Sequence, residues 1–175
     1  TAISLQDLGP DRIELDEIAA RLSLHRQDAL PIRPDHPYLD RQRRDAGPVP
    51  LPAEGVVDAV SGWMLHCASF PADRLPADWR SRAAPWRAYV DAAAVTQPVL
   101  TAPSPGMAFA PLGMDGRHKQ LGDFFTDRKV LPALRKGWPI VVDAASGRIV
   151  WVCGYAVAHE SRITDGTQRV RCFEW

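Results

Sequence analysis

The stretch Ile140-Val141-Val142-Asp143-Ala144-Ala145-Ser146-Gly147-Arg148-Ile149-Val150-Trp151-Val152-Cys153 contains two apolar runs joined by a short polar segment. Residues 140–142 and 149–153 are continuously apolar and rich in β-branched side chains, which is typical of strands covered on both faces. The linking segment, 143–147, contains Asp, Ser and Gly, which favour turns. The stretch therefore predicts a buried β-hairpin.

Two short helices are predicted just before this hairpin. Between Gln120 and Lys129, three apolar side chains recur at helical spacing and form one apolar face: Leu121, Phe124 and Phe125. Pro132 is suited to open a second helical turn, which Gly137 would end. We expect the apolar face of the first helix to pack on a sheet, so that its charged flanks face solvent.

Further strands are predicted on both sides of this region. Apolar residues alternate with polar or small ones between Val57 and Cys67, with a break at Ser61-Gly62 that indicates a hairpin. Val99-Leu100 begins another short strand, and residues 169–173 follow an Asp-Gly turn as the last one. Residues 71–88 are rich in proline and could hold a short helix. The fold class is therefore α+β, a mainly antiparallel sheet or sandwich with one or two short helices packed on it.

Residues 1–47 differ from the rest of the chain and predict a helical or irregular N-terminal arm, or the end of a preceding domain. An amphipathic stretch at 13–22, with Asp11 as its N-cap, favours a helix. Three prolines and a charged segment at 40–45 follow, and the prolines forbid a continuous helix there. The domain that carries the strands is thus expected at 48–175.

Composition narrows the class of protein. With 21 basic and 21 acidic residues the chain is formally neutral, which excludes binding by bulk charge. Its 16 prolines favour short elements over a long helical bundle. We expect neither a membrane span nor a signal peptide, and three free, buried cysteines in a reducing cytosol. Because the chain begins at Thr1 and not at Met, we expect a fragment or a processed product.

No catalytic motif is found. The sequence has no phosphate-binding loop, dinucleotide-binding glycine pattern, zinc-protease motif or nucleophile elbow. The five histidines are scattered, so no metal site and no cofactor are expected in this chain. His159 with Glu160, or His118 with Asp123, could form an acid–base pair, but surface histidines are the plainer interpretation.

One segment is strongly basic. From Arg117 to Lys136 there are six basic residues against two acidic ones, and all three lysines of the chain lie there. One interpretation is a solvated helix with a pair such as Lys119 and Asp123 at i,i+4 spacing. The other is a surface that contacts a phosphate backbone. The candidate RNA-binding residues are Arg117, Lys119, Arg128, Lys129, Arg135 and Lys136, with His118 as a further contact.

The same segment resembles a known family. Residues 109–119 read F-A-P-L-G-M-D-G-R-H-K and residues 121–130 read L-G-D-F-F-T-D-R-K-V. Together with W-V-C-G at 151–154, they resemble the C-terminal domain of tRNA(Ile)-lysidine synthetase. The resemblance covers roughly residues 48–175 and is most recognisable over 99–175.

This resemblance implies a function for the parent protein. Members of the family are cytoplasmic ligases that use ATP and lysine to convert the wobble cytidine of a minor isoleucine tRNA to lysidine. The ATP-binding chemistry belongs to an N-terminal PP-loop ATPase domain, whose S-G-G-x-D-S loop is absent from this chain. The resemblance therefore implies a non-catalytic portion that holds tRNA, with tRNA and the catalytic domain of the same polypeptide as its partners.

Several positions depart from the family pattern. Thr101 and Pro103 stand where arginines are usual, Met107 where an acidic residue is usual, and Ala156 where an arginine is frequent. Leu131 stands where the family has a proline.

Two alternatives to tRNA binding remain open. One is a module for protein interaction or homodimerisation without direct RNA contact. The other is an independent hydrolase that uses His159 or His118 in a deep pocket.

Overall fold

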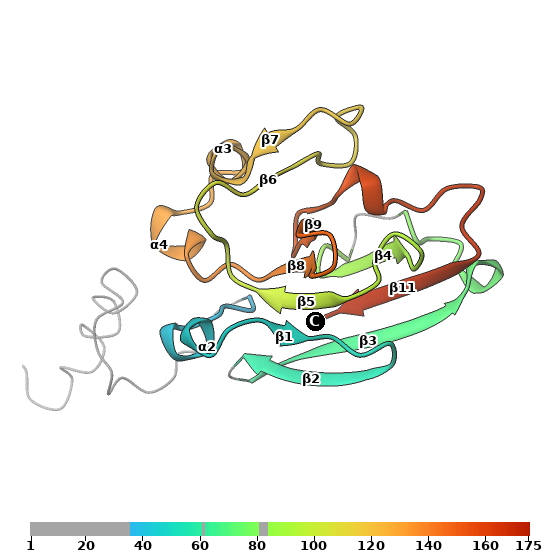
Figure 1. Cartoon of the computed structure of the whole chain (residues 1–175), viewed down its shortest axis with the longest axis horizontal. Coiled ribbons are helices and arrows are strands. Elements are labelled where there is room, and N and C mark those ends of the chain that lie inside the picture. The colour runs from blue at the N-terminus through green and yellow to red at the C-terminus, as the bar shows by residue number, and fades with distance from the viewer. Residues whose placement is uncertain (1–35, 61, 81–83) are drawn as a thin grey trace, which may run out of the picture. The chain divides into compact units, whose positions relative to one another are not determined.

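The computed structural model describes residues 36–60, 62–80 and 84–175 (Figure 1). A compact unit spans Asp35–Trp175. The helix predicted at 13–22 lies outside the described residues, as does most of the predicted N-terminal arm. The expected boundary at residue 48 falls within the compact unit, because the segment just before it packs against the strands.

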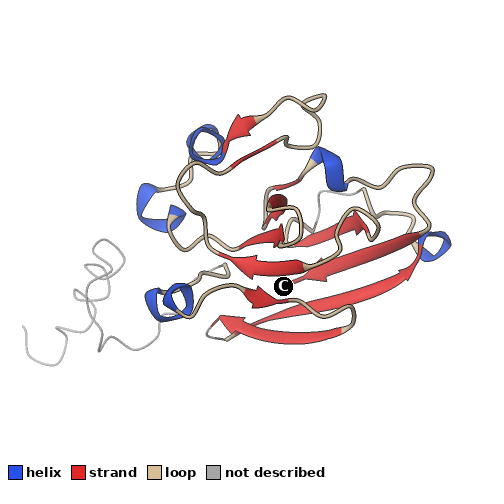
Figure 2. Ribbon diagram, viewed as in Figure 1, coloured by secondary structure: helices blue, strands red, loops and turns tan. Residues whose placement is uncertain are grey.

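Antiparallel strands dominate this unit (Figure 2). One sheet has the strand order β1 (Val49–Pro50), β5 (Pro98–Thr101), β8 (Ile140–Asp143), β9 (Arg148–Val152) and β10 (Ala156–Val157). A second sheet has the order β2 (Gly55–Val60), β3 (Trp63–Pro71), β11 (Arg169–Glu174) and β4 (Arg87–Asp91). A small third sheet pairs β6 (Ala108–Phe109) with β7 (Lys119–Gln120).

The helices are short. They are α2 (Arg41–Asp45), α3 (Leu121–Asp127) and α4 (Pro132–Arg135), with 3₁₀ turns η1 (Ala72–Arg74) and η2 (His159–Ser161). The predicted class, α+β with a mainly antiparallel sheet, is confirmed. None of the helices in the described ranges is long and apolar enough to cross a bilayer.

The hairpin of β8 and β9 is buried on both faces, as its apolar runs predict. One face belongs to the first core, which includes Val141 and Trp151 and draws on both large sheets. The other belongs to the second core, in which Ile140 and Val152 lie beneath α3 and the small third sheet. A bulge shifts the register between β8 and β9, so that Val150 and Trp151, although adjacent, both join the first core.

Most of the predicted elements are present. The strands β2 and β3 form the predicted hairpin, α3 and α4 lie where the apolar spacing and Pro132 place them, and all three cysteines are free and buried. In the described part of 71–88, the predicted short helix is only the turn η1. The prediction missed β4 and the two-residue strands β1, β6, β7 and β10, which are too short to show a periodicity.

The charged segment at 40–45 contains the short helix α2, which directly follows a buried segment. Asp40 caps α2 by accepting a hydrogen bond from the Arg43 amide at 2.8 Å. The preceding segment, His36–Leu39, which we call the strap, ends with Leu39 almost fully buried in the first core. Pro37, the last of the three prolines, precedes α2 by four residues, so a short helix fits after it.

Candidate nucleic-acid interface

Helix α3 carries the centre of the predicted basic surface. Its apolar face is buried in the second core through Leu121, Phe124 and Phe125, and the opposite face is exposed. The helix ends because Lys129 adopts the left-handed conformation (φ 56°), and the Val130 amide then donates back to the Phe125 carbonyl at 2.9 Å. Arg128 and Lys129 are therefore displayed at a helix end of fixed geometry.

Arg128 is held in place by aromatic rings. Its guanidinium lies 5.2 Å from the centre of the Phe124 ring, which is cation–π distance. Tyr155 also contacts Phe124, with an edge-on arrangement of the two rings. Burial raises the pKa of Tyr155, and the nearby charge of Arg128 partly offsets that rise. Arg128 thus remains exposed while its side chain is oriented by packing.

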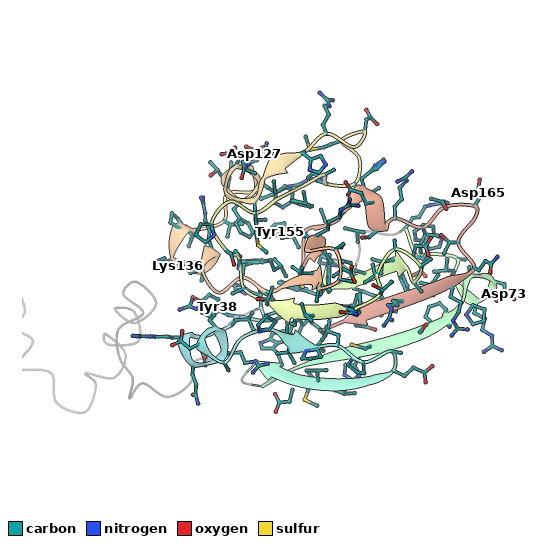
Figure 3. The ribbon with its side chains drawn as sticks, in the orientation of Figure 1. Tyr38, Asp73, Asp127, Lys136, Tyr155 and Asp165 are labelled. Carbon is teal, nitrogen blue, oxygen red and sulfur yellow. The ribbon has the colours of Figure 1, made fainter. Side chains whose placement is uncertain are left out.

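Four of the predicted cations have no carboxylate partner among the described residues: Arg117, Arg128, Lys129 and Lys136. All four are exposed. Lys129 follows α3, and Lys136 follows α4, near the end of the molecule where Tyr38 also lies (Figure 3). Charges that are exposed and unpaired are available to an external anion.

Two of the predicted cations are already engaged within the fold. Lys119 forms an ion pair with Asp127, at the far end of α3, and not with Asp123, the partner suggested in one of the two interpretations of the sequence. The predicted i,i+4 pair is wrong because Lys119 lies in β7, before the helix begins. Arg135 donates from Nε to the Val130 carbonyl at 2.9 Å and from Nη1 to Thr126 Oγ1 at 3.1 Å, which ties α4 to the end of α3.

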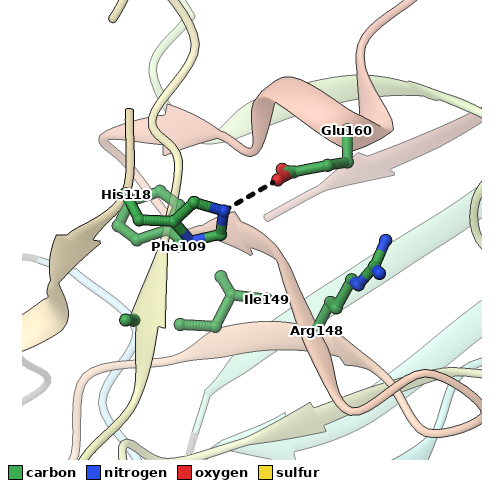
Figure 4. A pocket seen from close by; sticks show the side chains of 6 residues that line it. Phe109, His118, Arg148, Ile149 and Glu160 are labelled. Carbon is green, nitrogen blue, oxygen red and sulfur yellow. Dashed lines mark ion pairs between the residues drawn. The ribbon is translucent and has the colours of Figure 1, made fainter. Parts of the chain in front are cut away.

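His118 lies beside a different part of the fold. Its Nε2 is 3.5 Å from a carboxylate oxygen of Glu160 in η2, and not paired with Asp123 (Figure 4). The two side chains border a small pocket of about 140 Å³ together with Arg148. The pocket floor is apolar and comes from Ala108, Phe109 and Ile149.

The pocket does not have the features of a hydrolase site. The side chain of His118 is 67% exposed, and no third side chain orients its ring within the described part of the chain. His159, the other histidine considered, is not among the lining residues and packs near Gly116. In the described ranges, no three His, Cys, Asp or Glu side chains group as metal ligands would.

The three cysteine thiols are weak nucleophiles near neutral pH. Burial raises the pKa of Cys67 and of Cys172 to about 11, and raises that of the fully buried Cys153 further. The thiolate is the nucleophilic form, so these cysteines are not set up for covalent catalysis. Their role is packing.

Comparison with known proteins identifies the sheet domain. Residues 99–175 match the family model described as the TilS substrate C-terminal domain. Residues 99–175 therefore form a region similar to the TilS C-terminal domain. The chain is similar to a tRNA(Ile)-lysidine synthase of Caldanaerobacter subterraneus subsp. tengcongensis, with 37% identity over 70 residues that make up 40% of this chain. The match spans 14% of that relative's length.

A solved structure extends the likeness. The crystal structure of a TilS C-terminal domain superposes with a TM-score of 0.59 and 26% identity, covering 71% of this chain and 91% of the other. The shared fold therefore reaches beyond the 77 residues from 99 to 175, which make up less than half of the chain. The family recognition and the fold class drawn from the sequence are both confirmed.

The structure shows how two of the residues that depart from the TilS pattern, Met107 and Ala156, pack in the domain. Met107 is half-buried against the second core, and its sulfur accepts a hydrogen bond from the Ser104 amide at 3.3 Å. Ala156 is half-buried in β10 and packs against the same core. At these two positions the domain has apolar contacts, where the resemblance noted from the sequence leads us to expect charged side chains.

The sequence did not predict that His118, Arg148 and Glu160 line one pocket. Their meeting depends on two long-range backbone contacts: a bridge between Pro111 and Ala158, and a hydrogen bond from the His159 amide to the Ala110 carbonyl at 2.7 Å. No periodicity marks such contacts, since they join irregular segments. The sequence indicated only that Glu160 follows a histidine, as one half of a candidate acid–base pair with His159.

Proposed function

We propose that this chain positions tRNA, as the C-terminal portion of a cytoplasmic tRNA(Ile)-lysidine synthetase. In this proposal the chain is not catalytic by itself. The parent enzyme modifies the wobble cytidine of a minor isoleucine tRNA with ATP and lysine, and a PP-loop domain outside this sequence binds the ATP. The observation that carries the proposal is the group of exposed, unpaired cations that follow α3 and α4 in a TilS C-terminal domain.

The geometry suits a phosphate backbone. Folded RNA presents its phosphates and 2′-hydroxyls as a shape, which a rigid basic surface can contact without reading bases. The Phe124 ring orients the Arg128 side chain, so Arg128 loses less side-chain freedom on binding, and the helix end fixes the backbone of Lys129. Arg135 and Lys119 have partners within the fold and act mainly by shaping this surface.

The test is the salt dependence of binding of the chain to a transcript of a minor isoleucine tRNA. Removing one cation that neutralises a phosphate lowers the slope of log affinity against log salt by about 0.7–0.9. We expect Lys129→Gln with Lys136→Gln to lower the slope by about twice that amount. The matched control replaces two exposed arginines of other elements, Arg74→Gln with Arg169→Gln, and should leave the slope unchanged.

A second variant tests the surface in the opposite direction. Asp127→Asn removes the carboxylate that engages Lys119 and so exposes one further cation. We expect tighter tRNA binding and a steeper salt slope. If the Lys129 and Lys136 pair and Asp127→Asn both leave RNA binding unchanged, the surface is not an RNA interface. A two-fold dimer in sedimentation, without RNA affinity, would then support the interaction-module alternative.

A further inference from the structure

We infer that α2 belongs to the same phosphate-binding surface, because the strap fixes it beside α4. The inference rests on the proposed function and extends it to a segment that the sequence marked only as a charged arm. Its ligand is the phosphodiester backbone of RNA. Arg41 and Arg44, which lie on one side of α2, would add to the cations that follow α3 and α4.

The strap is built into the domain at the end of α4. The Leu39 amide donates to the Gly137 carbonyl at 2.7 Å, and the Leu39 side chain is 2% exposed. Gly137 has no room for a side chain, since a Cβ there would lie 2.3 Å from the Leu39 carbonyl oxygen and 2.4 Å from the Tyr38 ring. Gly137 directly follows Lys136, and Leu39 directly precedes the N-cap of α2, so the two basic segments are brought together here.

Aromatic stacking fixes the beginning of the strap. The His36 ring lies 4.7 Å from the Trp138 ring and 6.0 Å from the Trp86 ring, nearly parallel to the latter. Trp86 in turn covers Gly154, where a Cβ would come within 2.9 Å of the indole. With Pro37 buried between the two anchored residues, the strap is held along its whole length. The position of α2 is therefore set by packing and not by a free linker.

Arg41 and Arg44 are available for an external ligand. The Arg41 side chain is 86% exposed, and its one carboxylate partner among the described residues is Asp45, itself 70% exposed, at 3.6 Å. Exposed pairs of this kind are weak and can exchange for a phosphate. Arg44 donates a long hydrogen bond of 3.5 Å to the Tyr38 hydroxyl, which orients it toward the strap. Tyr38 and Lys136 lie at the same end of the molecule (Figure 3).

Charge arithmetic favours a composite surface. Residues 40–45 contain three arginines and two aspartates, so α2 with its cap has a net charge of +1 and cannot bind RNA strongly alone. Residues 128–136 contain four cations and no acid. Since each neutralised phosphate releases counterions, adjoining cations add their contributions along one backbone. The strap holds the arginines of α2 next to the cations of residues 128–136.

The experiment replaces Arg41→Gln with Arg44→Gln in the full chain and measures tRNA affinity from low to physiological salt. We expect the slope to fall by about 0.7–0.9 for each arginine that binds a phosphate. Asp45→Asn, which frees Arg41, should steepen it. The Arg74→Gln with Arg169→Gln variant is the control for removal of charge elsewhere, and circular dichroism verifies the fold of each variant.

A strap variant separates position from charge. His36→Ala with Leu39→Ala keeps every arginine and lysine but loosens α2, so the Arg41 and Arg44 substitutions should then change the slope less than in the intact chain. An unchanged slope for Arg41→Gln with Arg44→Gln overturns the inference, while a lowered slope for Lys129→Gln with Lys136→Gln keeps the proposed function. If α2 substitutions weaken association with a catalytic domain and leave RNA binding intact, α2 is a protein contact, and the inference is also wrong.

Discussion

The two cores of this domain are assembled in different ways. The buried members of the second core come from one continuous region, Phe109 to Ala158, which includes α3 and the hairpin of β8 and β9. The first core draws on residues from Leu39 to Phe173, including every strand of the second sheet except β2 among its buried members. The second core is thus local in sequence, and the first depends on contacts between distant segments.

The difference explains where the family signal lies. Local contacts leave a recognisable order of residues, so the second core coincides with the most recognisable segment and carries the cations on its outer side. Contacts of the first core are spread over short strands, each with little pattern of its own. The hairpin of β8 and β9 joins the two, because its faces belong to different cores.

The largest expected effect comes from the largest fully buried side chain of this hairpin. Trp151→Ala removes a side chain that is 1% exposed, and such truncations cost about 3–5 kcal/mol. Phe125→Ala, at 2% exposed, makes the matched truncation in the second core. Urea unfolding followed by fluorescence and circular dichroism should give one coincident transition in both variants. Two separate transitions in either one would show that the cores are independent and would break the comparison.

The next largest expected effect on stability comes from substituting glycines at which two chain segments approach closely. Gly154→Ala and Gly137→Ala place a methyl group against Trp86 and against the strap, and we expect destabilisation by about 1–3 kcal/mol. The matched control is Gly122→Ala on the exposed face of α3, where nothing lies within 4 Å. There the same change should stabilise the domain by about 0.5–1 kcal/mol. Equal effects at all three sites in thermal unfolding would contradict the close packing of the strap.

Acid should weaken the link between β8 and the segment before β5. Burial alone would raise the pKa of Asp143, but hydrogen bonds from the Gln97, Ser146 and Thr96 amides and the Ser146 hydroxyl hold it below its usual value. A lowered pKa stabilises the fold above the unfolded value of about 3.9, and this contribution disappears as pH falls through the folded pKa. Asp143→Asn should cost about 1–3 kcal/mol at pH 7 and flatten the dependence of stability on pH below about 4, as measured by urea unfolding across that range.

The smallest expected effect is a difference in the rate at which the three cysteine thiols are chemically labelled. Since burial raises their pKa values, Cys67, Cys153 and Cys172 should react with a thiol reagent near neutral pH only after unfolding. Trp151→Ala opens the core that holds Cys67 and Cys153, so it should speed their labelling, whereas Phe125→Ala should do so less. Mass spectrometry of each labelled cysteine measures the difference. Fast labelling of Cys153 in the unaltered chain would contradict the packing described.

The candidate interface was only partly predictable. The exposure of Arg128 and Lys129 follows from the apolar face of α3, which the spacing of Leu121, Phe124 and Phe125 sets. The partner of Lys119 could not be predicted, because Lys119 belongs to a strand that precedes the helix, where helical spacing does not apply. The contact of His118 with Glu160 joins residues far apart in the sequence and depends on a bridge between irregular segments.

By itself, the sequence determined the local elements: the two-faced hairpin, the amphipathic helix α3, the turn opened by Pro132 and the family to which residues 99–175 are similar. These depend on periodicity and on turn chemistry, which act between near neighbours. Only the tertiary structure decided which charges are free, which face one another, and that the strap brings α2 to α4. Those outcomes are set by packing between distant segments, such as Leu39 against Gly137, and no local pattern of residues encodes them.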